Sequence, residues 1–393
     1  MSYRCDFELV EEIANVVLKG LAKPLFVAKE LVGIDEKIAT IESWIKKDSK
    51  GTCLIGIWGM GGIGKTTLAE EVFNKLHSEY EACYFLAHER EESNKHGIIS
   101  LKEKIFSELL GCEVKIYTQN SLPGHIARRI SRMKVLIVLD DVNNSDHIKN
   151  LLGDFGNFGS GSTIIVTTRN EQVLKTNKVD ETYQLTKLSF NEALELFYLL
   201  VGKQDDNQME YNELCERVVH YAQGIPLVLK VLAGHLRGNK KEVWESELDK
   251  LKRMPHKEVY DVMTWSFYDL DRKQQQIFLD LACFFLGSQS EINVGELKFL
   301  LKDSERDNSV VADLQRLKEK SLITVSKDNF VSMHDNLQDM AWEIVRQESI
   351  EDPGRRSRLW DPDDIYEALK SDKVSLNEYI SFLLTNFWFI YLL

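Results

Sequence analysis

A glycine-rich loop between an apolar strand and an amphipathic helix constrains this chain more than any other feature. The loop reads GMGGIGKTT and matches the pattern G-x-x-x-x-G-K-[ST] at Gly59, Gly64, Lys65 and Thr66. The apolar run CLIGI precedes it and a helical pattern follows it. A chance glycine loop seldom meets four fixed positions in that context, so the motif predicts the phosphate-binding loop of an α/β P-loop domain.

Each residue type in this loop has a physical reason to face phosphate. Glycines let the backbone wrap close to phosphate oxygens, and the helix N-terminus adds partial positive charge. We expect Lys65 to neutralise the β- and γ-phosphates, Thr66 to ligate Mg²⁺ and Thr67 to bond the α-phosphate. The nucleotide-binding residues predicted in the loop are Gly59, Gly61, Gly62, Ile63, Gly64, Lys65, Thr66 and Thr67.

Two further apolar runs end in polar residues. VLIVLDD places Asp140 and Asp141 at the carboxyl end of a strand, the edge where open parallel sheets bind ligands. We expect Asp140 to be the second Mg²⁺ partner and Asp141 to orient or deprotonate the attacking water, although two acids after a strand alone would suggest a solvated loop. TIIVTTRN places Arg169 after another strand. It is either a reporter of the γ-phosphate or a surface arginine.

The order of elements predicts three folded parts. Apolar runs at 53–57, 83–87, 135–139 and 163–167 alternate with helical segments, which is typical of a parallel sheet with helices on both faces. After about residue 187 the pattern is helical, apart from a hairpin-like stretch at 322–333, which suggests a winged-helix module. We expect domains at 29–187 (P-loop), 188–265 (helical) and 266–370 (winged helix), with a linker helix within 1–28 and an apolar tail at 371–393.

Two helix starts are predicted from capping patterns. Ser189 with Glu192, and Asp335 with Gln338, fit the capping box. Pro226 after Gly224 also fits a helix start, and His334 just before a helix would ordinarily be structural.

Composition narrows the class of partner and the compartment. The net charge of −13 argues against a broad nucleic-acid surface. The six scattered cysteines include no C-x-x-C pair, so we expect reduced thiols in a cytoplasmic protein. The apolar segment 379–393 is too short to span a membrane as a helix. It is a packing helix, a membrane-surface anchor or a tail outside the fold.

Six ordered segments carry a family resemblance. GMGGIGKTTLA, VLDDV, GSTIIVTTR, QGIPLVL, FLDLACFF and VSMHDNLQDMAWEIVRQES resemble the motifs of the NB-ARC module of plant NLR immune receptors. FLDLACFF and PGRRSRLWDPDDI (353–365) resemble the class that carries a TIR domain. The resemblance covers about residues 8–370.

The resemblance implies a nucleotide switch. In that family ADP holds a closed resting state, and exchange for ATP opens the module and permits oligomerisation. Val32 and Gly33 match the adenine-side loop, Pro226 matches the proline beside the base or sugar, and His334 matches the histidine of the M-H-D motif that bonds the ADP β-phosphate.

Some positions depart from the family pattern. Residue 143 is Asn rather than Asp, and Ile225 replaces the usual Leu. From the Met beside the linker helix and the loss of resemblance after Leu369, we expect neither a TIR domain, with its NAD-cleaving activity, nor leucine-rich repeats.

Three functions remain open from the sequence. The first is a regulatory switch that binds ADP or ATP with Mg²⁺, hydrolyses slowly at most, and associates with itself or with NLR proteins. The second is an active remodelling ATPase, and the third is a non-catalytic fragment that modulates full-length receptors. DNA binding through the winged helix is disfavoured because acidic residues outnumber basic ones between 261 and 370.

Overall fold

The computed structural model describes residues 31–47, 51–119, 121–202, 208–251, 257–286, 292–301 and 309–370. The chain divides into two compact units, one up to Leu188 and one from Ser189. The linker helix expected within 1–28 and the tail at 371–393 lie outside the described residues. No helix in the described ranges is long and apolar enough to cross a membrane.

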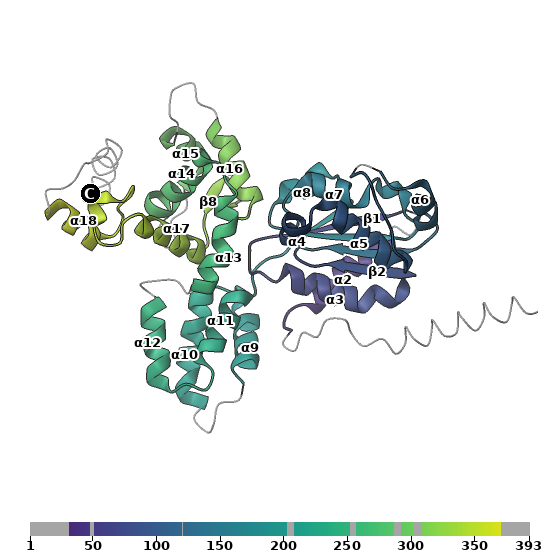
Figure 1. The fold of residues 1–393 in the computed structure, drawn as a ribbon. Coiled ribbons are helices and arrows are strands. Elements are labelled where there is room, and N and C mark those ends of the chain that lie inside the picture. The colour runs from purple at the N-terminus through teal and green to yellow at the C-terminus, as the bar shows by residue number, and fades with distance from the viewer. Residues whose placement is uncertain are drawn as a thin grey trace, which may run out of the picture. The chain divides into compact units, whose positions relative to one another are not determined.

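The first unit, which carries β1, β2 and α2 to α8 in Figure 1, is built on a parallel sheet. The order of its strands, among the described residues, is β2-β3-β4-β1-β5. Its strands are β1 (Cys53–Trp58), β2 (Ala82–Leu86), β3 (Val135–Leu139), β4 (Thr163–Thr168) and β5 (Glu181–Gln184). Its helices are α2 (Asp35–Lys47), α3 (Lys65–Leu76), α4 (Glu89–His96), α5 (Ile98–Leu110), α6 (Gly124–Ile130), α7 (Ser145–Leu152) and α8 (Glu171–Thr176). Short 3₁₀ turns span η1 (His77–Glu79) and η2 (Phe155–Asn157).

Period-two alternation along the strands builds a core on each face of the sheet. In β3, Leu136 and Val138 pack with the apolar residues of α2 and α3, whereas Val135, Ile137 and Leu139 pack with those of α5, α6, α7 and α8. Both faces are therefore buried, which explains why β1 and β3 are apolar throughout and why β4 is apolar from Ile164 to Val166. The predicted α/β P-loop architecture is confirmed.

The second unit begins with helices α9 (Phe190–Val201), α10 (Gln208–Ala222), α11 (Pro226–Leu236), α12 (Lys241–Leu251) and α13 (Lys257–Tyr268). Both halves of the predicted Ser189–Glu192 capping box are present at the start of α9. Pro226 opens α11, where its missing N–H removes no helical hydrogen bond.

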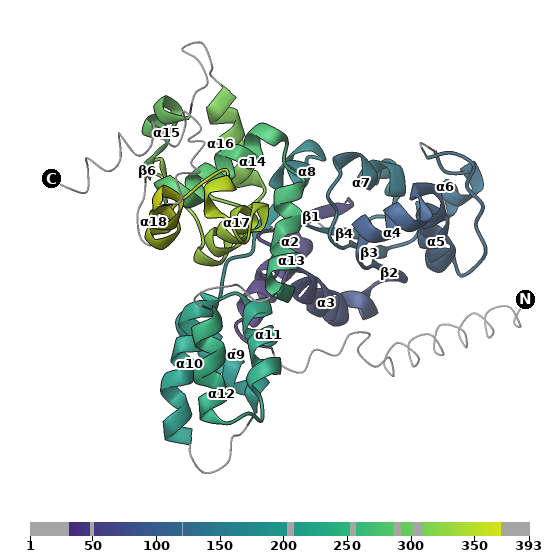
Figure 2. The ribbon, with the colours of Figure 1, turned by 60° about the vertical axis from the view of Figure 1, so that its left-hand side comes forward.

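The rest of the second unit is the winged helix, seen from another side in Figure 2. Its helices are α14 (Arg272–Asp280), α15 (Val294–Leu300), α16 (Ser309–Glu319), α17 (Asp335–Glu348) and α18 (Pro362–Lys370). A π-helical turn, η3 (Leu281–Phe285), follows α14, and a 3₁₀ turn, η4 (Pro353–Arg355), precedes α18. The wing is an antiparallel sheet of order β6-β8-β7, from β6 (Ile292–Asn293), β7 (Thr324–Val325) and β8 (Phe330–Ser332).

Two sequence motifs meet inside the winged helix. Arg358 from RRSRLW donates from Nε to Asp280 Oδ1 at 2.6 Å, and its Nη2 donates to the Gln276 carbonyl at 3.1 Å. Both charged side chains are at most about one-tenth exposed. This buried ion pair therefore fastens the segment before α18 to the end of α14.

Two local details of the structure differ from the predictions made from the sequence. The strand β5 was not predicted, because ETYQ is short and its alternate side chains are exposed. The N-cap of α17 is His334 rather than Asp335, since the His334 ring nitrogen accepts the Asn336 N–H. Gln338 does not close a capping box; its side-chain amide donates to the carbonyls of Ala282 and Leu286.

Candidate nucleotide-binding site

The phosphate-binding loop joins β1 to α3. Gly59, Gly62 and Gly64 have φ values of 151°, 76° and 101°, a region that L side chains avoid. A Cβ on Gly59 would also lie 2.7 Å from the Leu185 carbonyl oxygen. Ile63 instead buries its side chain in the core beneath α3, which leaves only its backbone to face a ligand. The loop geometry thus depends on glycine at these positions.

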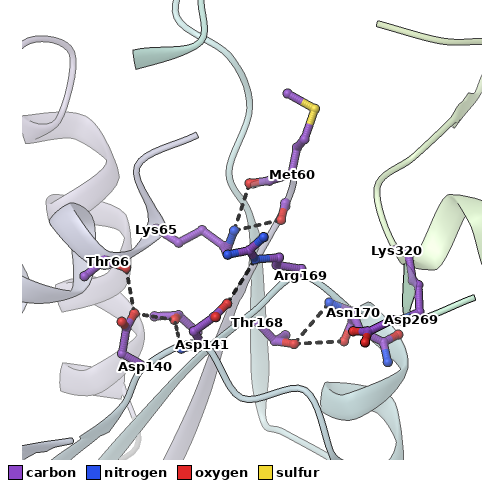
Figure 3. A network of polar contacts seen from close by, with 12 residues as sticks. Met60, Lys65, Thr66, Asp140, Asp141, Thr168, Arg169, Asn170, Asp269 and Lys320 are labelled. Atoms are coloured by element: carbon purple, nitrogen blue, oxygen red, sulfur yellow. Dashed lines mark hydrogen bonds and ion pairs between the residues drawn. The ribbon is translucent and has the colours of Figure 1, made fainter. Parts of the chain in front are cut away.

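Lys65 is buried at the first position of α3. Its Nζ donates to the carbonyl oxygens of Gly59 at 2.9 Å and Met60 at 2.8 Å (Figure 3). Burial, together with the nearby Arg169 charge, lowers the pKa of Lys65 to about 7. An anion at this loop would supply the compensating charge that the buried ammonium lacks.

Asp140 has one satisfied carboxylate oxygen and one without a partner. Its Oδ1 accepts from the hydroxyls of Thr66 at 2.9 Å and Thr167 at 2.7 Å. The residue is fully buried, and Oδ2 has no hydrogen-bond partner. A buried unpaired carboxylate oxygen costs free energy unless a cation or donor meets it.

These oxygens fit Mg²⁺. The cation takes oxygen ligands, and it is usually held by one or two protein groups together with phosphates and water. Within the described residues there is no cluster of three or more histidine, cysteine or acidic side chains that would form an all-protein metal site. Thr66 and Asp140 would therefore hold the ion jointly with a nucleotide phosphate.

Asp141 and Arg169 form an ion pair beside this pair of oxygens. Arg169 Nε lies 3.1 Å from Asp141 Oδ1, and both side chains are mostly buried. Asp141 has φ 58°, a strained value for a non-glycine residue, and its N–H donates to the Thr167 hydroxyl at 2.9 Å. The ends of β3 and β4 thus bring together the two residues that the sequence assigned to water activation and γ-phosphate sensing; both roles stay predictions.

Two contributors to the site were not predicted from the sequence. Thr167 bonds both Asp140 and Asp141, and the Met60 carbonyl bonds Lys65. Thr167 could have been found, because the carboxyl end of β4 lies beside that of β3 in the sheet order. A backbone carbonyl leaves no trace in the residue type.

Two other predicted positions precede α2. Gly33 has φ 63°, and its carbonyl accepts from the Lys37 ammonium. Val32 is half-buried beside it. Thr67 is half-buried in the first turn of α3. Their contacts with a nucleotide stay predictions.

Pro226 and His334 lie in the second unit. His334 Nε2 donates to the Gln223 carbonyl at 3.3 Å, while Nδ1 accepts the Asn336 N–H at 3.2 Å. These two bonds together require the neutral tautomer with its proton on Nε2. Because Gln223 and Gly224 form the turn before Pro226, this hydrogen bond ties His334 to the turn that leads into α11.

Comparisons with known proteins decide the family. The model of the NB-ARC domain matches residues 34–207, and that of the Roq1-like winged-helix domain of disease resistance proteins matches residues 271–349. Residues 34–207 therefore belong to the NB-ARC domain family. The two matches confirm the resemblance to the NB-ARC module and the predicted winged-helix domain.

Curated relatives of this NB-ARC chain are plant disease-resistance proteins. Disease resistance protein RPV1 of Vitis rotundifolia is 38% identical over 94% of the chain, and TMV resistance protein N of Nicotiana glutinosa is 34% identical over 94%. The chain spans 26% and 32% of these relatives' lengths. The Walker-type ATPase of Pyrococcus abyssi has a TM-score of 0.53 at 12% identity, covering 82% of this chain and 98% of that one. That likeness supports the fold alone.

Proposed function

We propose that the chain is an adenine-nucleotide-dependent switch of plant immune signalling, resting with ADP and active with ATP, with Mg²⁺ at Thr66 and Asp140. The immune role is suggested by the disease-resistance relatives. The observation that carries nucleotide binding is the meeting of Lys65, Thr66 and Asp140, with Asp140 Oδ2 buried and unpaired. A Mg²⁺-phosphate group supplies both charges that this arrangement lacks.

The bound phosphates would change the partners of Lys65. Its Nζ would exchange the Gly59 and Met60 carbonyls for phosphate oxygens, which gives the buried ammonium a counter-charge. Thr66 would keep its hydroxyl proton toward Asp140 and turn its oxygen to the cation. A bound Mg²⁺ would neutralise part of the negative charge on the phosphate oxygens.

A third phosphate would meet the Asp141–Arg169 pair. A guanidinium has several donors, so Arg169 can bond a γ-phosphate while Nε keeps Asp141. Asp141 is engaged by this ion pair, which reduces its availability to accept a proton from water. We therefore expect slow hydrolysis at most, with the γ-phosphate sensed rather than rapidly cleaved.

Direct titration tests nucleotide binding. Mg²⁺-ADP and Mg²⁺-ATP should bind the parent chain in calorimetry, and Lys65→Ala should lose this binding. Lys75→Ala is the matched control, because Lys75 lies on the same helix, its side chain is more than half exposed, and its ion-pair partner is Glu42 on α2. Equal affinity in the parent and Lys65→Ala would remove the loop from the site. Turnover in the ordinary enzyme range of about 1–10³ per second would refute the switch.

A further inference from the structure

One buried pair near the site has no role in the proposed binding chemistry. Glu89, the first residue of α4, is fully buried and pairs through Oε1 with Nδ1 of His147 on α7 at 2.9 Å. Its second oxygen, Oε2, has no hydrogen-bond partner. A buried carboxylate pays a desolvation penalty, and apolar residues of similar volume often pack at least as stably as a buried ion pair. Packing alone therefore does not explain the pair.

The backbone of Glu89 reaches the other end of the same loop. Its N–H donates to the Asp140 carbonyl at 2.7 Å, and the Asp140 N–H donates to the Leu86 carbonyl at 2.9 Å. The segment from Asp140 to His147 is thus held at its first residue by the backbone of Glu89 and at its last by the side chain of Glu89. Glu89, at the start of α4, thus closes this loop into a ring.

The loop that is closed in this way is strained and functional. It carries Asp140, whose carboxylate meets Thr66, and Asp141, whose φ is 58°. Strained backbone persists only where its surroundings determine it. The start of α7 is also fixed by Asn144, whose side chain accepts the Asp146 N–H at 2.9 Å. The turn between Asp141 and His147 is thus held by a hydrogen bond of its own.

We propose that Glu89 and His147 are positioning residues that bracket the 140–147 loop and thereby hold the Asp140 carboxylate in the geometry that binds Mg²⁺. The inference rests on the proposed function, because it concerns the same metal and nucleotide. Glu89 and His147 act through Asp140 and do not contact the ion. Groups that orient metal ligands from behind typically contribute about 10–100-fold to metal affinity.

The test separates cation geometry from phosphate binding. The quantity to measure is the Mg²⁺ enhancement, defined as the ratio of ADP dissociation constants without and with Mg²⁺. His147→Leu and the double variant Glu89→Leu/His147→Leu should lower this enhancement about tenfold, with ADP affinity in EDTA unchanged. Glu89→Gln keeps an acceptor oxygen for His147 and should retain most of it.

The double variant guards against simple misfolding. It refills the space without leaving a lone buried charge, so it should fold and still show the reduced enhancement. Glu91→Gln is the matched control, because Glu91 is on the same helix and pairs with Lys95 at the surface. A parent-like enhancement in the double variant would mean that the pair only fills space, and the proposal would fail. An equal loss of ADP affinity in EDTA would likewise overturn it.

A ligand-free measurement decides the bracket independently. Amide hydrogen exchange of peptides covering 140–147 should quicken in the double variant, while peptides from β1 stay as in the parent. Unchanged exchange in the loop would refute the bracket. If the parent chain bound no ADP at all, the proposed function would fail, and the exchange result would still stand for or against the bracket.

Discussion

The negative charge of Asp140 favours Mg²⁺ binding but lowers the stability of the ligand-free protein, and replacing Asp140 by asparagine tests both effects. The buried carboxylate has one satisfied oxygen and one without a partner. Asparagine keeps an acceptor for Thr66 and Thr167, and it replaces the unpaired charged oxygen by a neutral amide nitrogen, which costs less free energy to leave unpaired. Asp140→Asn should therefore stabilise the ligand-free protein and abolish the Mg²⁺ contribution to nucleotide binding.

The magnitude follows from two opposing changes. A buried ion costs several kcal/mol in desolvation. Against this relief, two charge-assisted hydrogen bonds become neutral, and each loses about 1 kcal/mol. Lys65 limits any further loss, since its pKa of about 7 lets it release its proton. The net gain is about 1–2 kcal/mol, or roughly 2–8 °C in Tm for a domain of this size.

Differential scanning calorimetry is the assay, with scans of the ligand-free protein in EDTA, of the protein with ADP in EDTA, and of the protein with ADP and Mg²⁺ without EDTA. The first transition of Asp140→Asn should move up without ligand and should not respond to Mg²⁺. Asp146→Asn serves as the control, because Asp146 is exposed in the same segment. A lower Tm for ligand-free Asp140→Asn would refute the claim that the unpaired oxygen is a liability.

Four further outcomes follow from the structure. Above pH 7, ADP binding should be accompanied by proton uptake, because a bound phosphate raises the lowered pKa of Lys65. Calorimetry at pH 8 should then give binding enthalpies that depend on the ionisation enthalpy of the buffer. Binding enthalpies that are the same in all buffers would contradict this. In the ligand-free protein, burial disfavours the charged form of Lys65, and this lowers the free energy of unfolding by its full amount below pH 7. The free energy of unfolding should therefore gain a contribution from Lys65 as the pH rises from 7 toward 10.5, which urea titrations at several pH values would measure. Thr167→Val should weaken Mg²⁺-ADP binding and lower the unfolding free energy by about 1–3 kcal/mol. The substitution removes the hydrogen bond to Asp140 and leaves the Asp141 N–H without its acceptor. An unfolding free energy equal to that of the parent in denaturant titration would show that Thr167 does not stabilise the site. Arg358→Ala should cost about 3–5 kcal/mol in the second unit, because it removes the charged partner of the buried Asp280 carboxylate. Arg355→Ala, at an exposed ion pair, should change the unfolding free energy little, and similar losses in the two variants would argue against the buried pair.

The sequence predicted the fold where burial was strongest. The strands at 135–139 and 163–167 were predicted because both of their faces are buried, so their composition alone distinguishes them. The strand β5 escaped because half of its side chains face solvent and its residues are polar. The small strand β6 escaped because two residues carry no periodicity.

The site was predictable only as far as motifs reach. The pattern at Lys65 and Thr66 indicated phosphate and Mg²⁺, and the strand-end rule pointed to Asp140. The second carbonyl contact of Lys65 and the Asp141–Arg169 pairing depend on side-chain directions that spacing does not encode. Glu89 and His147, 58 residues apart in the chain, meet only through the fold.

The most direct test of the account is the identity of the small molecule carried by the purified protein. The chain would be purified, denatured, and its released ligand identified by chromatography and mass spectrometry. The account predicts about one ADP per chain, absent in Lys65→Ala and retained in Lys75→Ala. A well-folded parent chain that carries no nucleotide and binds none on titration would contradict it.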